Sequence, residues 1–357
     1  MKTEKNIFKM KGILTICIVF FFYSIILVKA QDIHFSQFAY APLQINPAMT
    51  GVFEGKIRFA NTYRSQWSGL GNGYKTIHIS ADAPIGRSNS RESHFGVGAL
   101  LYQDKAGTAG YKATVVEGSL SYFTGLNELN ESFFAMGFQA GLNQQSIDLE
   151  KATWDSQWNG DTYDPSLSSG ESIQLQQFSY LDLNAGLLYY FIPDENNSFS
   201  IGAAMSHIGN PNSSFYLESE TPLRTKITVH SGGEISVDNA YEMWAVPKLL
   251  FTVQGNQKEI IAGGYLKRKV HLKSVYTNYN KESFFYVGAF YRYQDAVSIA
   301  FRIEYNTLGL GISYDVNTST LSKLAGSANA FEVNFSIVPY LERGGRSKKG
   351  NPIPRFF

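Results

Sequence analysis

The feature of this sequence that most constrains its fold is a two-residue alternation of apolar and polar side chains along most of the chain. In 297–306, for example, the apolar members are Val297, Ile299, Phe301, Ile303 and Tyr305. Such a period places successive side chains on opposite faces of an extended strand. No segment of comparable length shows a convincing helical period, so we expect an all-β fold.

About fourteen segments show this alternation, and most exceed the five or six residues of an average strand. They lie near 56–66, 74–83, 94–104, 111–124, 131–144, 178–191, 197–207, 224–237, 241–254, 258–268, 283–293, 296–305, 308–316 and 330–340. Roughly nine to eleven residues of a tilted strand cross a bilayer. An even number of such strands is typical of a bacterial outer-membrane barrel with both termini in the periplasm.

The connections between these segments alternate in length. The three longest, 145–177, 208–223 and 317–329, follow odd-numbered segments, whereas most connections after even-numbered segments are short turns. Outer-membrane barrels combine long external loops with short periplasmic turns in this way. Residues 269–282 depart from the pattern and are either a longer periplasmic turn or extensions of two strands.

A soluble β-sandwich or β-barrel would share the alternation. In a membrane barrel, aromatic residues at strand ends would lie at the lipid–water interface. Such residues are Tyr63, Tyr74, Tyr189, Phe191, Tyr305 and Tyr314. The opposite face carries charges that suit a wet or plugged lumen and not a dry core. These are Arg58, Arg64, Asp82, Glu117, Asp182, Arg302 and Glu304. We therefore expect a transmembrane outer-membrane β-barrel of antiparallel strands over residues 56–340.

Residues 1–30 have the organisation of a cleavable signal peptide, with a basic start, an apolar run over 12–28 and Ala30 before a cut ahead of Gln31. A retained transmembrane anchor is the alternative. Cleavage removes Cys17, the one cysteine, and with it any disulfide or thiol chemistry. It leaves 26 of the 31 basic and 29 of the 30 acidic residues, a net charge of −3. That balance does not indicate nucleic-acid binding.

Two terminal segments flank the expected barrel. Residues 31–55 contain the turn Asn46-Pro47-Ala48 and form either a plug in the lumen or a periplasmic segment. The basic tail 341–357 is either a disordered exit from the barrel or a periplasmic tether to an acidic partner or to assembly machinery.

The sequence lacks motifs for catalysis, cofactor binding or metal binding. The six histidines are scattered singly, and no G-x-S-x-G, H-E-x-x-H, P-loop or C-x-x-C pattern occurs. An embedded hydrolase would need a Ser/His pair with an orienting acid. Alternation places His78 and Ser80 on one inward face, but such pairs arise by chance in any barrel. We expect no enzyme activity, no cofactor and no metal.

The segment 148–172 concentrates acidic and aromatic residues. Exposed tryptophans on a long loop often anchor a protein partner, so Trp154 and Trp158 are candidate partner contacts. Phe215 and Tyr216 form a second aromatic patch in the next long loop. A solvated acidic loop without a partner, or a sugar- or calcium-binding loop, are the alternatives.

Several short motifs are distributed over the mature chain. The most specific are the opening 31–38 (QDIHFSQF), the N-P-A turn 46–48 and the block 63–67 (YRSQW). With weaker matches at 104–107, 163–165 and 314–317, they resemble the PorP/SprF family of type IX secretion and gliding proteins of Bacteroidetes-type bacteria. The tail after residue 340 and the length of 269–282 depart from the family pattern.

The resemblance implies a non-enzymatic outer-membrane component that assists export or surface anchoring of a partner protein. Its expected partners are an adhesin or another secreted protein with a C-terminal sorting domain, the periplasmic ring and translocon of the secretion system, and outer-membrane lipid. The candidate structural or contact positions that carry over are Asn46, Pro47, Tyr63, Arg64, Gln66 and Trp67.

Alternation directs Arg64 and Gln66 into the barrel, where Arg64 can pair with a lumen carboxylate or hold the N-terminal segment. Trp67 would end the strand at the outer interface. A network that only stabilises the barrel is an equal alternative. A passive porin or uptake channel is the alternative function, and an outer-membrane enzyme is a remote third.

Overall fold

A computed structural model describes residues 32–67, 73–86, 93–127, 131–171, 173–194, 196–217, 219–238, 242–272, 281–319 and 329–339. The expected signal peptide and basic tail lie outside these residues. Among the described residues, no helix has both the length and the apolar character needed to cross a bilayer.

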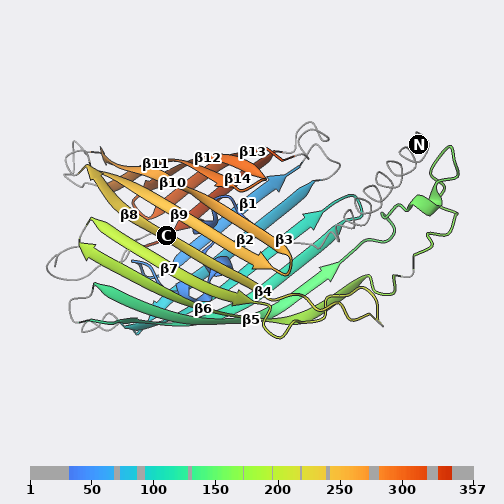
Figure 1. The fold of residues 1–357 in the computed structure, drawn as a ribbon, viewed down its shortest axis with the longest axis horizontal. Helices are drawn as coiled ribbons and strands as arrows, with labels where there is room; N and C mark the ends of the chain where they lie inside the picture. Colours follow the sequence, from blue (N-terminus) through green and yellow to red (C-terminus); the bar gives the residue numbers. More distant parts are fainter. Residues whose placement is uncertain are drawn as a thin grey trace, which may run out of the picture. The chain divides into compact units, whose positions relative to one another are not determined.

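Fourteen antiparallel strands in the described residues form one closed barrel, as the alternation predicted (Figure 1). Their bounds are β1 (Arg58–Gln66), β2 (Tyr74–Ile85), β3 (His94–Ala106), β4 (Tyr111–Gly125), β5 (Ser132–Ser146), β6 (Gln177–Asp194), β7 (Asn197–Ser206), β8 (Lys226–Asp238), β9 (Met243–Gln254), β10 (Gln257–Leu272), β11 (Lys281–Arg292), β12 (Ala296–Tyr305), β13 (Leu308–Asn317) and β14 (Ala330–Ile337).

The barrel closes between its first and last strands. β1 pairs with β14 from Phe59 opposite Ile337 to Gln66 opposite Ala330. Each of the fourteen described strands therefore has a hydrogen-bonded neighbour on both sides. Closure is what allows β-structure to cross hydrocarbon, because no water is present there to satisfy an edge.

In most strands, side chains alternate between a buried inner face and an exposed, mainly apolar outer face. In β12, Ile299 is 52% exposed whereas Ala300 beside it is 0% exposed. The apolar residues of the alternation face outward, where lipid solvates them. The seven charged residues assigned to the inner face from sequence are all buried there.

The barrel has a loop end and a turn end. The loop end carries the long connections after β5, β7 and β13, each of which is described in part. It is on the right in Figure 1. The turn end carries shorter connections such as 306–307. At this end β10 and β11 extend to Leu272 opposite Lys281, so residues 269–282 include extensions of two strands.

Residues 33–53, which we call the N-terminal plug, lie inside the barrel. The plug contains two 3-10 turns, η1 (Phe38–Tyr40) and η2 (Pro47–Met49), and one helical turn, α2 (Pro42–Ile45). Pro42 and Pro47 each stand at the start of a turn, where the missing N–H is not needed.

The plug runs from the loop end to the turn end before β1 begins. At its start, the His34 Nδ1 atom lies 3.9 Å from the carboxylate of Glu259, close to the β9–β10 turn of the loop end. At its other end, the Gly51 amide donates to Asp82, near the turn end of β2. The N-terminal end of β1 and the C-terminal end of β14 thus lie at the turn end, as expected. The plug that precedes β1, however, starts at the loop end.

This path predicts where the chain just before the plug is reachable. We expect an epitope tag placed between the expected signal peptide and Ile33 to be labelled on intact cells, together with a tag in 155–170, because both positions lie at the loop end. A tag in 193–197, at the turn end, should be labelled only after permeabilisation. An N-terminal tag that behaves like the 193–197 tag would contradict the threading of the plug.

Candidate functional site

Arg64 joins the start of the plug to the barrel seam. Its Nη2 donates to Asp315 Oδ2 at 2.8 Å, and its Nη1 donates to Glu332 Oε2 at 3.1 Å. Nη1 also donates to the Ser36 hydroxyl at 2.9 Å. One guanidinium therefore connects β1, β13, β14 and the plug.

The carboxylate of Glu332 binds the plug directly. It accepts the backbone N–H of Ser36 at 2.9 Å and that of Gln37 at 3.0 Å. The Arg292 guanidinium completes the group, with Nη2 at 3.3 Å from Asp315 and Nη1 at 3.3 Å from the Ser36 hydroxyl. Buried ions require such compensation, because an unpaired one costs several kcal/mol.

The other residues of the Y-R-x-Q-W block have different positions. Gln66 accepts a hydrogen bond from Arg64 Nε at 3.3 Å and so supports its orientation. Tyr63 lies on the outward-facing side of β1. Trp67 follows the strand with φ of 56° and packs edge-on against Tyr74, with 5.3 Å between ring centroids. Within this block, hydrogen bonds to the plug come from Arg64.

Asn46 fixes the middle of the plug. Its side-chain oxygen accepts the Ala48 N–H at 2.9 Å, which caps η2. Its amide donates to the Leu187 carbonyl at 2.9 Å and lies 3.0 Å from His230 Nε2. Pro47 begins η2, so the Asn-Pro pair both shapes the turn and ties it to β6 and β8.

The wall opposite this turn is made of glycines that the sequence analysis did not single out. A Cβ atom at Gly137 of β5 would collide with the backbone of Pro47, and one at Gly186 of β6 would collide with Asn46. Glycine is needed here for close approach and not for its backbone freedom. The two-residue alternation places both glycines at inward-facing positions of their strands, and this was the sequence signal that could have identified them.

At the turn end of the barrel, an ion pair and apolar packing hold the plug against the wall. Arg58 Nε and Nη2 donate to the two oxygens of Asp82 at 2.9 and 2.8 Å, and Nη2 also donates to the Met49 carbonyl. Asp82 accepts the Gly51 N–H at 2.7 Å. Next to them is a cluster of buried apolar side chains, which comprises Ala48, Met49, Val52, Phe123, Phe133, Ala135, Leu188, Tyr190 and Ile192.

The loop end carries the second candidate site, built from loops 147–176 and 207–225. The Leu175 N–H donates to the Phe215 carbonyl at 3.1 Å, and the Leu217 N–H donates to Gln174 at 2.9 Å. Phe215 packs edge-on against Phe178 of β6, with 4.7 Å between ring centroids. The two loops thus form one surface, which we call the loop platform.

The four aromatic residues predicted as partner contacts all lie on the loop platform, but they differ in exposure. Trp158 is 58% exposed and Tyr216 is 40% exposed. Trp154 and Phe215 are only partly exposed. Phe215 links the two loops, so Trp158 and Tyr216 present the larger aromatic surfaces.

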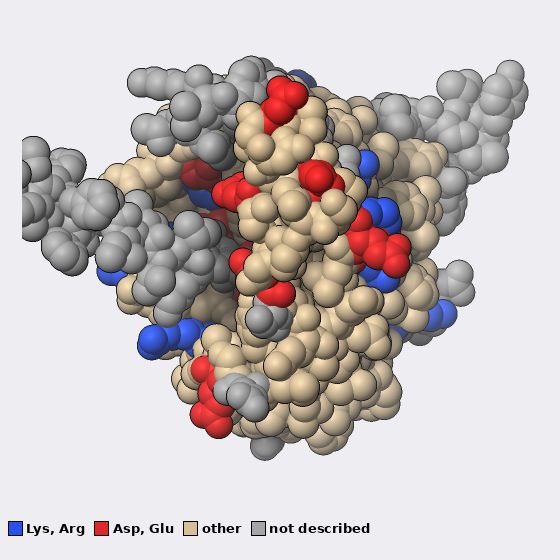
Figure 2. Space-filling view, turned by 90° about the vertical axis from the view of Figure 1, so that its right-hand side faces the viewer, with Lys and Arg blue, Asp and Glu red and all other residues tan. Residues whose placement is uncertain are grey.

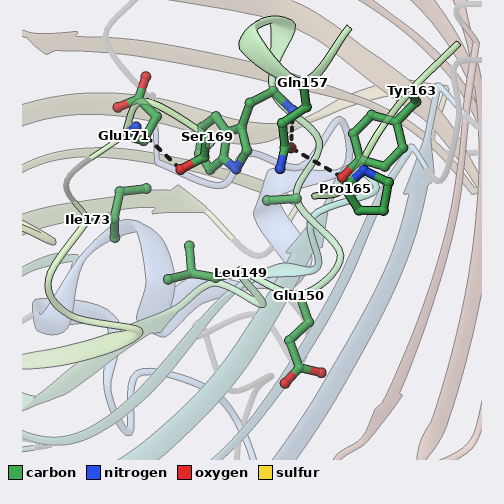
Figure 3. A pocket seen from close by; sticks show the side chains of 10 residues that line it. Leu149, Glu150, Gln157, Tyr163, Pro165, Ser169, Glu171 and Ile173 are labelled. Atoms are coloured by element: carbon green, nitrogen blue, oxygen red, sulfur yellow. Dashed lines mark hydrogen bonds between the residues drawn. The ribbon is translucent and has the colours of Figure 1, made fainter. Parts of the chain in front are cut away.

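Gln157, which the sequence analysis did not identify, organises loop 147–176. Its Oε1 accepts the Trp154 N–H at 3.3 Å and the Tyr163 hydroxyl at 3.1 Å, and its Nε2 donates to the Leu167 carbonyl at 3.1 Å. These hydrogen bonds hold the backbone of Trp154 and the hydroxyl of Tyr163. Figure 3 shows Gln157 beside Tyr163. A buried amide with three partners gives an otherwise irregular loop a defined shape.

A pocket of about 340 Å³ opens within this loop. Trp154, Tyr163 and Pro165 contribute to its lining, together with Glu150 and Glu171. Figure 3 shows the two glutamates on different sides of the pocket, with Tyr163 and Pro165 on a third. Figure 2 looks onto the loop end and shows further acidic side chains over the loops in its centre.

Local hydrogen bonds keep two other carboxylates of this loop ionised. The Ser166 hydroxyl and backbone N–H donate to Asp164 and lower the pKa of its carboxyl. The Lys151 ammonium, 2.6 Å from Asp148, lowers the pKa of that carboxyl. These two carboxylates therefore keep their negative charge to a lower pH than an unperturbed aspartate.

The described residues contain no group of three or more His, Cys, Asp or Glu side chains arranged to hold a metal ion. His78 and Ser80 both face inward, but neither His78 ring nitrogen nor the Ser80 hydroxyl has a hydrogen-bond partner among the described residues. No nucleophile–base hydrogen bond joins this pair.

Comparison with known families decides the assignment. The family described as "Type IX secretion system membrane protein PorP/SprF" matches residues 27–337. The chain belongs to the PorP/SprF family. With its closed fourteen-stranded barrel, this PorP/SprF protein is an outer-membrane protein of the type IX secretion system, and the resemblance inferred from sequence is confirmed.

Solved structures of low similarity include other bacterial proteins. The toluene transporter TodX of Pseudomonas putida is 10% identical over 83% of this chain and 92% of its own, with a TM-score of 0.47. BamA from Haemophilus ducreyi lacking POTRA domains 1–3 is 12% identical over 80% of this chain and 70% of its own, with a TM-score of 0.39. We draw no functional conclusion from either. No curated protein matches the chain.

The arrangement around Arg64 yields a stability prediction. Replacing Arg64 by leucine removes the ion pair of buried Glu332 and leaves Asp315 with Arg292 alone, and breaking a buried pair of this kind costs about 3–5 kcal/mol. We expect the Arg64→Leu barrel to unfold at lower denaturant concentration in heat-modifiability gels, with its plug more accessible to protease. Tyr63→Phe, on the outward face of the same strand, is the matched control. Equal stability of both variants would contradict the anchoring role.

Proposed function

We propose that this PorP/SprF protein is a non-enzymatic barrel that assists export or surface anchoring of a partner protein through the loop platform. The partner is an adhesin or another secreted protein with a C-terminal sorting domain. The observation that carries the proposal is that the lumen is occupied by the plug, while aromatic residues are exposed on ordered loops at one end.

The depth of the plug supports a lumen that stays filled. Leu43, Ala48, Val52 and Phe53 are fully buried. Burying a leucine, valine or phenylalanine side chain contributes about 1.5–3 kcal/mol each. Displacing the plug would expose these groups and break its hydrogen bonds to Glu332 and Asp82. These costs weigh against the passive porin as the alternative function.

The loop platform supports partner binding. Interface energies are concentrated in a few residues, and tryptophan and tyrosine are enriched among them. Trp158 and Tyr216 are held on loops joined by backbone hydrogen bonds. The competing location for a partner is the turn end, including the tail 341–357, through which we propose contacts with the periplasmic ring and translocon.

The partner-binding proposal predicts the effect of removing the two loop tryptophans. Trp154→Ala and Trp158→Ala should leave heat-modifiable migration of the barrel unchanged but reduce the partner protein retained on the cell surface. A hot-spot truncation costs about 2 kcal/mol, which is roughly thirtyfold in affinity. Deletion of 341–357 is the comparison. If that deletion abolishes retention and the tryptophan variants do not, the partner binds at the turn end.

The filled lumen predicts low conductance. In planar bilayers the purified protein should show no steady single-channel current under conditions in which a control porin conducts, because the plug is tied to the wall at both ends. Porin-like, long-lived open steps from the intact protein would favour the passive channel over the proposed function.

A further inference from the structure

The pocket of loop 147–176 offers a more specific assignment, which rests on the proposed function. Residues 148–171 carry six acidic side chains, namely Asp148, Glu150, Asp155, Asp161, Asp164 and Glu171, against the one base Lys151. Lys151 pairs with Asp148 at 2.6 Å. Glu150 and Glu171 are the two carboxylates that line the pocket. Glu150 helps to raise the pKa of Lys151, but no salt bridge within 4.0 Å is made by either glutamate among the described residues.

The aromatic side chains that line the pocket also favour a cation, as its carboxylates do. Trp154 and Tyr163 line the same pocket, and both are held through hydrogen bonds to Gln157. The face of an indole or phenol ring attracts a cation, and tryptophan does so most strongly. Aromatic faces combined with unpaired carboxylates are the chemistry that recognises an ammonium or a guanidinium.

The geometry favours a cationic side chain over a metal ion. Glu150 and Glu171 lie on different sides of the pocket in Figure 3, and no group of three or more His, Cys, Asp or Glu side chains among the described residues converges as a metal site. Calcium needs six to eight oxygen ligands around one point. A polypeptide segment that crosses the pocket can instead meet both carboxylates and the aromatic wall.

We propose that this pocket binds a lysine or arginine side chain of the partner protein, with Trp154 and Tyr163 against the cation and Glu150 and Glu171 neutralising it. Trp158 contacts the partner outside the pocket. The two tryptophans, four residues apart, therefore have different roles: Trp154 selects a basic residue, and Trp158 adds apolar contact area.

The test uses the full-length barrel in detergent and saturation-transfer NMR with heptapeptides of glycine and serine. One peptide carries a central arginine, a second a central lysine and a third a central glutamine. We expect the two basic peptides to bind, to weaken as salt is raised, and to bind at least about tenfold more tightly than the glutamine peptide. Equal binding of the glutamine peptide would overturn the proposal.

Matched variants locate the site. Glu150→Gln with Glu171→Gln, and separately Trp154→Ala, should each weaken the arginine peptide about tenfold. Asp155→Asn with Asp161→Asn removes the same charge from the same loop outside the pocket and should not change peptide binding. Equal losses in pocket and control variants, or displacement of the peptide by millimolar calcium or by a neutral sugar, would overturn the assignment.

The outcome is separable from that of the proposed function. If no basic peptide binds but the tryptophan variants still lose the partner from the cell surface, the pocket assignment fails and the loop platform stands. If surface retention is unaffected in both tryptophan variants, the proposed function fails whatever the peptides do.

Discussion

The interior of this barrel is wider than its own inward side chains can fill, and the rest of the structure depends on how that space is occupied. Interiors of about eight strands are filled by side chains, whereas about sixteen to eighteen strands leave an aqueous channel. This chain, with fourteen strands, fills the space with residues 33–53. The plug is therefore an integral part of the barrel and the main determinant of what its lumen can do.

The plug can occupy the lumen because it carries no acidic residue, lysine or arginine, while charged side chains of the barrel wall form ion pairs with one another. The sequence has no Asp, Glu, Lys or Arg between Asp32 and Glu54. Ion pairs within the wall include Arg58 with Asp82, Arg64 with Asp315 and Glu332, Arg292 with Asp315, and Arg302 with Glu304. The plug contributes apolar side chains and backbone amides, and the wall carboxylates accept those amides. No charge of the plug has to be compensated, which avoids the largest cost of burying a segment.

Sequence predicted the strands well because the alternation is a local signal. A strand with one face in lipid and one in the lumen must repeat every two residues, so strand positions, inward charges and the direction of Arg64 follow from neighbours in sequence. The path of the plug and its contacts do not follow in this way. Ser36 is hydrogen-bonded to Glu332, 296 positions away in the sequence. Gly137 and Gly186 are required because the turn at Asn46 and Pro47 leaves no room for a Cβ atom at either position. The role of Gln157 depends on the folded shape of an irregular loop, which has no period to read.

The plugged barrel also affects how the loops at the loop end can bind a partner. Loop 147–176 leaves β5 and returns into β6, and it is hydrogen-bonded to loop 207–225 and, through Asp148, to the β3–β4 turn at Ala109. Four strand ends of a filled barrel thus fix the starting points of these loops, and Gln157 binds the backbone N–H of Trp154 and the hydroxyl of Tyr163. Side chains and loops that are ordered before binding lose less conformational entropy when a partner arrives. A plugged lumen therefore favours a binding surface at the loop end for the same reason that it opposes a channel: the wall beneath the loops cannot easily change shape.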